Sequence, residues 1–361
     1  MKIIIDKNIP YIQGALEQTA EVKYLTYREM TPDTVRDADA LIVRTRTACN
    51  RELLEGSQVK FIATATIGYD HIDTKYCDEN GIKWTNAPGC NALSVTQYMA
   101  SVLCLLAERN NMELSKKTIG IVGVGNVGSR VEKLANIFGL RLLLNDPPRA
   151  RREGSQHFVT LKEIAEQADI IAFHPFLNYE GIDKTFHLAD EDFFKSLRRK
   201  PIIINASRGE VVETKALKNA MKNGLVADVV LDCWENEPDI DLELLYDTFI
   251  ATPHIAGYSA DGKANASTQS VQSVSRFFKL GLDHWQPNDL PKGLDVDFSN
   301  HSISSFFLES YNILADSELL KSSPATFELQ RSRYPIRREP KAYLGYLPEG
   351  FEKKFGVFFA P

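Results

Sequence analysis

The sequence has little of what disulfide cross-linking, metal binding or membrane insertion would require. Only five cysteines occur in 361 residues, none of them in a Cys-x-x-Cys pair or in a cluster with histidine. An odd number of cysteines predicts reduced thiols. The apolar run Ile3–Ile5 ends at Asp6, and no run approaches the roughly 18 apolar residues of a membrane span. We therefore expect a cytoplasmic protein with no metal site and no membrane partner.

An excess of basic charge is also missing. The chain has 42 lysines and arginines against 48 acidic residues, a formal net charge of −6. This balance argues against a nucleic-acid partner. A small anionic substrate remains possible, because a few arginines or backbone amides suffice to bind one. The length allows two or three domains.

Short apolar runs alternate with amphipathic segments along about the first 250 residues, a pattern typical of parallel sheets covered by helices on both faces. The runs expected to form strands are 2–5, 40–43, 61–63, 118–122, 141–144, 170–173, 202–205, 226–231 and 248–251. The segments expected to form helices include 92–110, 127–138, 161–167, 214–223 and 264–280. The pattern fits two such sheets better than one.

A glycine-rich motif, GVGNVG, directly follows the expected strand 118–122. Gly123, Gly125 and Gly128 permit a tight turn and a close approach of backbone amides to a pyrophosphate. Asp146 lies eighteen residues after Gly128, at the end of the next expected strand. A carboxylate there can accept hydrogen bonds from ribose hydroxyls and repel a 2′-phosphate. The combination predicts NAD as cofactor, although three arginines between 149 and 152 leave NADP open.

Four further polar side chains lie at or just beyond the ends of expected strands. Arg208 lies in NASRGEVV, Asp232 and Glu237 in DCWENEP, and His254 in TPHIAGY. Ligands of open parallel sheets bind outside the carboxyl ends of the strands. We therefore expect these side chains to face the same crevice as the glycine motif.

These residue types suit the oxidation of a hydroxy acid. Hydride can leave C2 only as the hydroxyl proton departs, and a histidine such as His254 is a suitable base. A carboxylate such as Glu237 would orient the imidazole, and Arg208 could hold the substrate carboxylate in a bidentate manner. Each residue alone could equally be structural, whereas the set favours catalysis.

These motifs resemble those of the D-isomer-specific 2-hydroxyacid dehydrogenase family. Segments such as KIIIDKNIPY and HIAGYSADGKANAST are similar to a branch that oxidises a phosphorylated hydroxy acid of the pyridoxal 5′-phosphate (vitamin B6) pathway. The resemblance covers nearly all of residues 1–280. It implies hydride transfer to NAD, and a homodimer formed largely through a C-terminal module.

The resemblance also implies a role for each matched residue. Arg208, Glu237 and His254 would be catalytic, with His254 as the proton donor or acceptor. Cofactor contacts are expected from Gly123, Gly125, Asn126, Val127, Gly128, Asp146, Pro175, Asp232 and Gly257. Substrate contacts are expected from Thr45, Thr66 and Tyr258. Pro175 is a departure, because the family often has threonine there, so any contact must come from its carbonyl group or from packing.

The predicted fold class is α/β, with two doubly wound parallel-sheet domains and a small C-terminal α+β module. A flavodoxin-like substrate-binding domain is expected to comprise residues 1–92 and 256–283. A Rossmann-type NAD-binding domain is expected over 93–255. A separate dimerisation module, rich in aromatic residues, is expected over 293–361 after a proline-containing linker.

Two other functions compete with this interpretation. Another 2-hydroxyacid dehydrogenase, such as one acting on 3-phosphoglycerate, would share the catalytic residues. A non-enzymatic NAD-sensing protein like the C-terminal-binding corepressors would share the fold, but this chain lacks a disordered interaction tail. Turnover of candidate hydroxy acids distinguishes all three.

Overall fold

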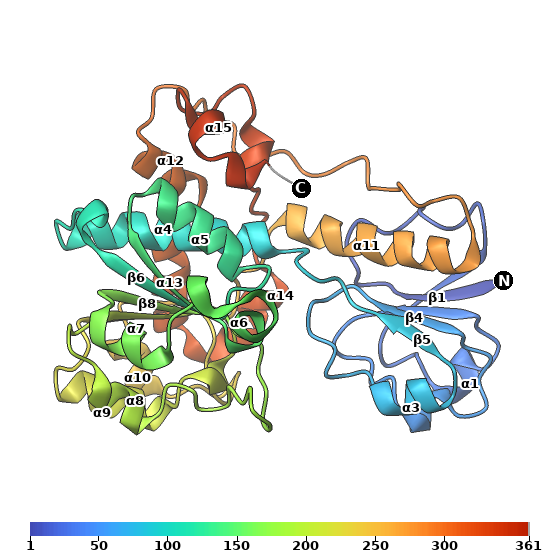
Figure 1. Ribbon diagram of the computed structural model, residues 1–361. Coiled ribbons are helices and arrows are strands. Elements are labelled where there is room, and N and C mark those ends of the chain that lie inside the picture. The colour runs from blue at the N-terminus through green and yellow to red at the C-terminus, as the bar shows by residue number, and fades with distance from the viewer. Residues whose placement is uncertain (360–361) are drawn as a thin grey trace. The chain divides into compact units, whose positions relative to one another are not determined.

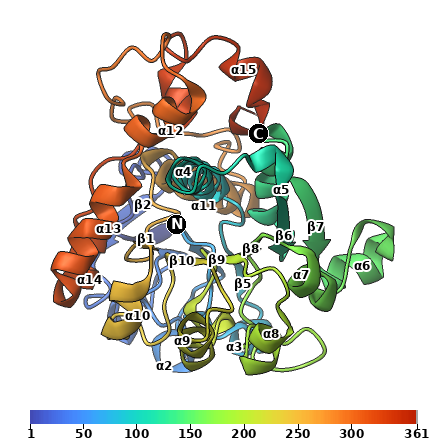
Figure 2. The ribbon, with the colours of Figure 1, turned by 90° about the vertical axis from the view of Figure 1, so that its left-hand side faces the viewer.

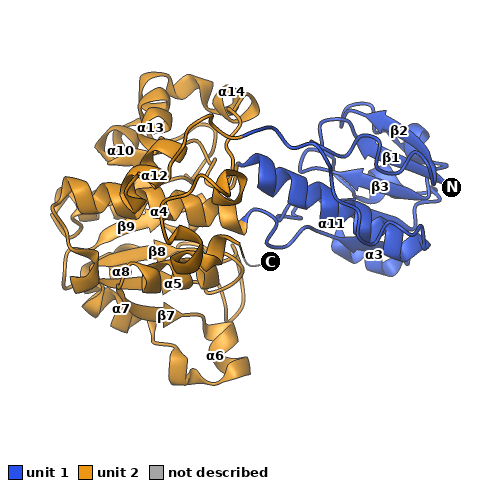
Figure 3. Cartoon of the chain, turned by 90° about the horizontal axis from the view of Figure 1, so that it is seen from above, with its two compact units in different colours: residues 1–91, 259–292 blue, residues 92–258, 293–361 orange. Residues whose placement is uncertain are grey.

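The computed structural model describes residues 1–359, which form two compact units (Figure 3). The first unit comprises residues 1–91 and 259–292, and the second comprises 92–258 and, of the C-terminal residues, 293–359. None of the helices in the described part of the chain is long and apolar enough to span a bilayer.

The first unit contains a five-stranded parallel sheet with the order β2-β1-β3-β4-β5, which is the flavodoxin-like order that was predicted. Its strands are β1 (Lys2–Asp6), β2 (Glu21–Leu25), β3 (Ala40–Val43), β4 (Phe61–Thr64) and β5 (Lys83–Thr85). Its helices are α1 (Pro32–Val35), α2 (Arg51–Leu54), α3 (Thr74–Glu79) and α11 (Ala260–Phe278). The sequence pattern missed β2 and β5, because both are partly exposed edge strands with mixed composition.

The second unit contains a six-stranded parallel sheet with the order β11-β10-β9-β8-β6-β7. Its strands are β6 (Thr118–Val122), β7 (Arg141–Asn145), β8 (Ile170–Phe173), β9 (Ile202–Asn205), β10 (Asp228–Leu231) and β11 (Ile250–Ala251). Its helices up to residue 258 are α4 (Ala92–Arg109), α5 (Gly128–Ile137), α6 (Pro147–Glu153), α7 (Leu161–Gln167), α8 (Glu191–Ser196), α9 (Thr214–Lys222) and α10 (Leu242–Asp247). Figure 1 shows β6 and β8 below α4 and α5, and Figure 2 shows β10, β9, β8, β6 and β7 in that order. The strand order reverses between β6 and β8, as in the predicted Rossmann-type domain.

The second sheet is buried on both faces, which explains the continuous apolar runs in its sequence. Within β9, Ile202 and Ile204 pack into the core that contains α4 and α5, whereas Ile203 packs into the core on the other face. This alternation follows from the two-residue repeat of a strand. Helices cover both faces, so the side chains within these strands are mostly apolar and the polar groups gather at the strand ends.

The C-terminal segment is helical, and the predicted α+β module is wrong in this respect. Its helices are α12 (Ile303–Ser310), α13 (Ile313–Ser322), α14 (Phe327–Ser332) and α15 (Phe351–Lys354), and residues 293–359 contain no strand. Helix α12 lies beside α4 (Figure 2). The rings of Phe306 and Phe307 on α12 are fully buried in the same core as α4. Because its aromatic side chains fill a helix-packing core, this segment shares the core of the second unit instead of forming its own.

Candidate active site

The predicted catalytic pair is assembled at the carboxyl edge of the second sheet. His254 Nδ1 lies 2.8 Å from Glu237 Oε2, and Glu237 Oε1 accepts a hydrogen bond from the backbone of Trp234 at 2.8 Å. Burial raises the pKa of the Glu237 carboxyl, but the charge and hydrogen bond of His254 and the Trp234 amide outweigh it, so the pKa lies below its usual value. Glu237 is therefore ionised at neutral pH and fixes the orientation of the imidazole.

His254 lies on a loop whose backbone is strained. Its φ of +55° is in the left-handed region, which is unfavourable for a residue with a Cβ atom. The amide of His254 donates to the carbonyl oxygen of Asp232 at 2.7 Å, and this bond helps to hold the conformation. The strain is local to the residue that would exchange a proton with substrate.

The carboxylate of Asp232 holds this loop in place through three hydrogen bonds. It is buried, and it accepts hydrogen bonds from the Thr252 hydroxyl at 2.7 Å and from the amides of Ile255 and Ala256 at 2.7 and 3.0 Å. Burial raises the pKa of Asp232, while the charge of His254 and the three donors oppose that shift. Asp232 was predicted as a cofactor contact; the geometry shows that its carboxylate binds the Thr252 hydroxyl before His254 and two backbone amides after it.

Arg208 lies on the neighbouring loop, which follows β9. Its guanidinium is half-buried, and Nη1 donates to the carbonyl oxygen of Ser207 at 2.8 Å. A Cβ atom at Gly209 would lie 1.9 Å from the carbonyl carbon of Trp234, so this loop packs directly against the one that carries Glu237. Glycine at 209 is what allows the loops of Arg208 and Glu237 to approach so closely.

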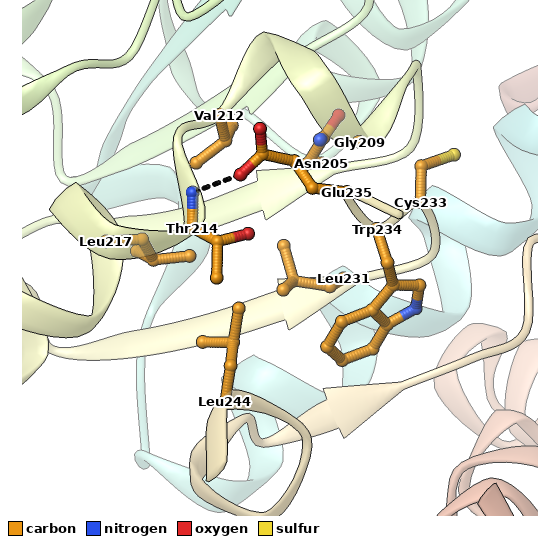
Figure 4. Close-up of a pocket in the computed structure, with 10 residues that line it drawn as sticks. All are labelled: Asn205, Gly209, Val212, Thr214, Leu217, Leu231, Cys233, Trp234, Glu235 and Leu244. Carbon is orange, nitrogen blue, oxygen red and sulfur yellow. Dashed lines mark hydrogen bonds between the residues drawn. The ribbon is translucent and has the colours of Figure 1, made fainter. Parts of the chain in front are cut away.

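The contacts of Glu235 also hold the loop that carries Glu237. Glu235 accepts a hydrogen bond from the Thr214 amide at 2.7 Å (Figure 4), and its other oxygen lies 2.6 Å from His187 Nε2. The small cavity beside them has a volume of about 10 Å³, which is the size of one water molecule. This region is too small for a substrate and serves to hold the loop.

The glycine motif has the backbone form that a dinucleotide requires. Gly123 has a φ of +83°, and a Cβ atom there would lie 2.4 Å from Pro175 N. A Cβ atom at Gly128 would lie 2.0 Å from Gly123 O, whereas one at Gly125 would meet nothing within 4 Å. The turn is therefore closed at Gly123 and Gly128 and open at Gly125, where a ligand can approach the backbone.

The remaining predicted cofactor residues surround this turn. The N-cap of α5 is Val127, which makes no side-chain cap hydrogen bond, and Asn126 before it is exposed, so amides at this helix end can bind a pyrophosphate. Asp146 accepts hydrogen bonds from the amides of Val124 and Arg149 at 2.8 and 2.9 Å. These residues fit NAD, with Asp146 held by the glycine loop itself. Gly257 directly follows Ala256, whose amide Asp232 binds.

The predicted substrate residues are divided between the units. In the first unit, Thr45 is exposed just after β3, and the Thr66 hydroxyl lies 2.7 Å from that of Thr64 and donates to Gly68 O at 2.8 Å. In the second unit, Tyr258 is half-buried, with its ring centroid 5.9 Å from the guanidinium of Arg331.

The sequence predicted no metal site, yet Cys233, Glu237 and His254 offer ligand atoms that lie within 4.8 Å of one another. Burial, together with the negative charges of Asp232 and Glu237, raises the pKa of the Cys233 thiol well above its usual value. The protonated thiol is a poor ligand, because metals bind the thiolate. We therefore interpret this group as the catalytic pair with a packed thiol beside it.

Sequence reasoning missed several residues that shape the site. Trp234 Nε1 donates to Thr252 O at 2.9 Å, and the Tyr98 hydroxyl lies 3.1 Å from that of Thr252. Arg331, on α14, contributes a positive charge that favours the ionised form of Glu237. Thr252 is close to a strand end and could have been found on that basis, but nothing in the sequence pattern connects Tyr98 or Arg331 with the catalytic loops.

Comparisons with known proteins agree with this geometry. Residues 102–256 match the family model described as D-isomer specific 2-hydroxyacid dehydrogenase, NAD binding domain. The chain is 54% identical over 344 residues to an erythronate-4-phosphate dehydrogenase of Bacteroides fragilis, covering 95% of this chain and 98% of that protein. It is 55% identical over 344 residues to the protein of the same name from Bacteroides thetaiotaomicron, with the same coverage.

Solved structures of more distant relatives share the fold. A D-lactate dehydrogenase from Aquifex aeolicus, in complex with NAD and lactic acid, has a TM-score of 0.63 and 26% identity, covering 78% of this chain and 97% of that one. A 3-phosphoglycerate dehydrogenase of Entamoeba histolytica with bound NAD+ has a TM-score of 0.62 and 25% identity, covering 81% and 99%. The chain belongs to the D-isomer-specific 2-hydroxyacid dehydrogenases and, among them, to the family of the erythronate-4-phosphate dehydrogenases.

Proposed function

We propose that this chain oxidises 4-phospho-D-erythronate to 2-oxo-3-hydroxy-4-phosphobutanoate with NAD, in the biosynthesis of pyridoxal 5′-phosphate. The observation that carries the proposal is the His254–Glu237 pair at 2.8 Å, located at the same sheet edge as an open glycine turn. The similarity to relatives of that name along 95% of the chain supports the choice of substrate.

The pair explains how the substrate proton would be removed. Because Nδ1 of His254 is engaged by Glu237, Nε2 is the nitrogen that remains for the C2 hydroxyl. NAD supplies the hydride acceptor when bound. As the hydroxyl proton moves to Nε2 the imidazole becomes positively charged, and the adjacent Glu237 carboxylate stabilises that charge.

Substrate recognition follows from the charges of the anion. Arg208 is proposed to hold the carboxylate and to polarise the forming 2-keto oxygen, since a planar guanidinium matches a carboxylate in geometry. Thr45, Thr66 and Tyr258 are proposed to contact the rest of the substrate, and Pro175, which packs against Gly123, is proposed to contact NAD only through packing or its carbonyl.

We further propose a cytoplasmic homodimer formed largely through the C-terminal segment. Half of the sixteen exposed large hydrophobic side chains in the described part of the chain lie in that segment. They are Leu294, Val296, Leu314, Leu319, Leu329, Ile336, Leu344 and Tyr346. Apolar side chains concentrated in this way are typical of a protein interface.

The direct test of function is reduction of NAD by the purified enzyme with 4-phosphoerythronate, compared with 3-phosphoglycerate and unphosphorylated erythronate. We expect the highest kcat/KM for 4-phosphoerythronate, measured by absorbance of the reduced nicotinamide. A higher value for 3-phosphoglycerate would assign the chain to a different dehydrogenase activity. No turnover of any hydroxy acid, with NAD still bound, would favour a sensing role.

We expect His254 and Glu237 to act as one unit. His254→Ala should lower kcat by a hundredfold or more, on the order expected for loss of a general base. Glu237→Gln should lower kcat less and move the acid side of the pH–rate profile to lower pH, because the protonated imidazole loses its ionised partner. The double variant should be little worse than His254→Ala alone. Additive losses, or an unmoved profile for Glu237→Gln, would show that the two residues are independent.

The preference for NAD is expected to depend on Asp146. Asp146→Ala removes the charge that repels a 2′-phosphate and also the acceptor for ribose hydroxyls, so the ratio of kcat/KM with NAD to that with NADP should fall. Because Asp146 also binds the Val124 amide, Asp146→Asn serves as a control that keeps the shape without the charge. An unchanged ratio in both variants would assign cofactor choice to other residues.

The homodimer can be tested by sedimentation velocity. Leu319→Glu places a charge on an exposed apolar position of the C-terminal segment and is expected to weaken association. Ile182→Glu, at a position that is 87% exposed outside that segment, is the matched control and should leave the dimer intact. A monomeric wild type, or a dimer equally stable in both variants, would place the interface elsewhere.

A further inference from the structure

We propose that Arg337, in the C-terminal segment, is a positioning residue for the catalytic histidine. Its guanidinium Nη2 donates to the carbonyl oxygen of Ala256 at 2.6 Å and lies 3.5 Å from that of Ile255. Both peptide groups directly follow His254. The inference rests on the proposed role of His254 in proton transfer, and it assigns to the C-terminal segment a part in catalysis.

Arg337 and Asp232 bind the same short stretch of backbone, Arg337 at its carbonyl groups and Asp232 at its amides. The carboxylate of Asp232 accepts from the amides of Ile255 and Ala256 at 2.7 and 3.0 Å, and Arg337 donates to the carbonyl groups of the same two residues. Each charged side chain therefore favours the peptide orientation that the other one binds. Together they form a clamp around residues 255 and 256.

This clamp lies next to the strained residue. His254 has a φ of +55°, an unfavourable conformation that persists only when the surroundings enforce it. The amide of His254 is tied to Asp232 O, and the residues that follow are tied to the Asp232 carboxylate and to Arg337. Relaxing the clamp would let the imidazole leave the position in which Nδ1 meets Glu237.

The surroundings of Arg337 show that packing alone does not explain it. The residue is 5% exposed, its guanidinium lies 4.1 Å from the ring centroid of Tyr311, and Nε and Nη1 have no hydrogen-bond partner among the described residues. Two acidic side chains favour its charged form. Asp316 accepts a hydrogen bond from the Tyr334 hydroxyl at 2.7 Å, and Glu339 accepts one from the Ser94 hydroxyl at 2.8 Å. A buried guanidinium with unsatisfied donors is destabilising compared with an apolar side chain, so its bonds to the catalytic loop are its clearest role.

The test compares Arg337→Met, which removes the charge and the donors, with Arg337→Lys, which keeps the charge. We expect kcat for 4-phosphoerythronate oxidation to fall at least about tenfold in Arg337→Met and to recover partly in Arg337→Lys. The KM for the hydroxy acid and the Kd for NAD should stay within about threefold of the wild type, because Arg337 is buried and its hydrogen bonds go to the backbone of Ile255 and Ala256. The matched control is Arg333→Met, an exposed arginine of the same segment, which should keep the wild-type kcat.

A spectroscopic signature separates positioning from general destabilisation. The proton shared between His254 Nδ1 and Glu237 should give a strongly downfield ¹H NMR resonance in the wild type and in Arg333→Met, and this resonance should be lost or shifted in Arg337→Met. A folded Arg337→Met with wild-type kcat and an unmoved resonance would overturn the proposal. If Arg337→Met does not fold, Arg337→Gln decides, with a fall in kcat supporting the proposal and a wild-type kcat overturning it.

Different results would contradict the proposed function and this inference. Absence of hydroxy-acid turnover in the wild type would remove the proposed function, whereas the downfield resonance can still be measured in all variants. Normal turnover of the Arg337 variants, with a wild type that oxidises 4-phosphoerythronate, would remove the inference alone.

Discussion

The catalytic end of this protein depends on one buried negative charge, the carboxylate of Asp232. A carboxylate removed from water is unfavourable unless hydrogen bonds replace its hydration, and here a hydroxyl and two amides do so. Those donors come from residues on both sides of His254, so compensating the charge also determines the path of the loop. The raised pKa of Asp232 reflects the burial that makes this arrangement necessary. The left-handed backbone of His254 is tolerated because these bonds leave the loop no relaxed alternative.

The parallel sheet explains why so many functional groups meet there. Carboxyl ends of parallel strands lie at one edge, so Asp146 after β7, Arg208 after β9, Asp232 after β10 and His254 after β11 share that edge of one sheet. The glycine turn follows β6 at the point where the strand order reverses. Two close approaches of backbone, of Gly123 to Pro175 and of Gly209 to Trp234, bring the loops together without side chains between them. The functional side chains at this edge are therefore carried by short loops on a rigid sheet.

The sequence predicted what depends on local pattern. Continuous apolar runs such as 118–122 and 202–205 indicated buried strands because both faces of the sheet are covered, and the catalytic and glycine motifs follow such strands directly. Partly exposed edge strands such as β2 lack that signal and were missed. The C-terminal segment was wrongly expected to contain strands, since aromatic content alone does not distinguish a strand from a helix that buries Phe306 and Phe307. Contacts that do not follow from the ends of parallel strands, such as that of Tyr98 with Thr252, could not be predicted.

The hydrogen bonds of Arg337 are an example of contacts that the sequence does not predict. Arg337 lies 81 positions from Ala256, beyond the residues that match the family model, and in the sequence it is one of several arginines in a polar stretch. Packing of α12 against α4, with which it shares one apolar core, and of α13 against β11 brings its segment to the loop of His254. The C-terminal segment, which the sequence suggested only for dimer formation, therefore contacts the backbone beside His254, the proposed catalytic histidine. Since the same segment exposes Leu319 and Leu329 to solvent, whatever covers those side chains also constrains the helices that support Arg337. In the proposed homodimer, association would therefore be coupled to the position of Arg337 through one stretch of packed chain, without any residue of the partner having to enter the active site.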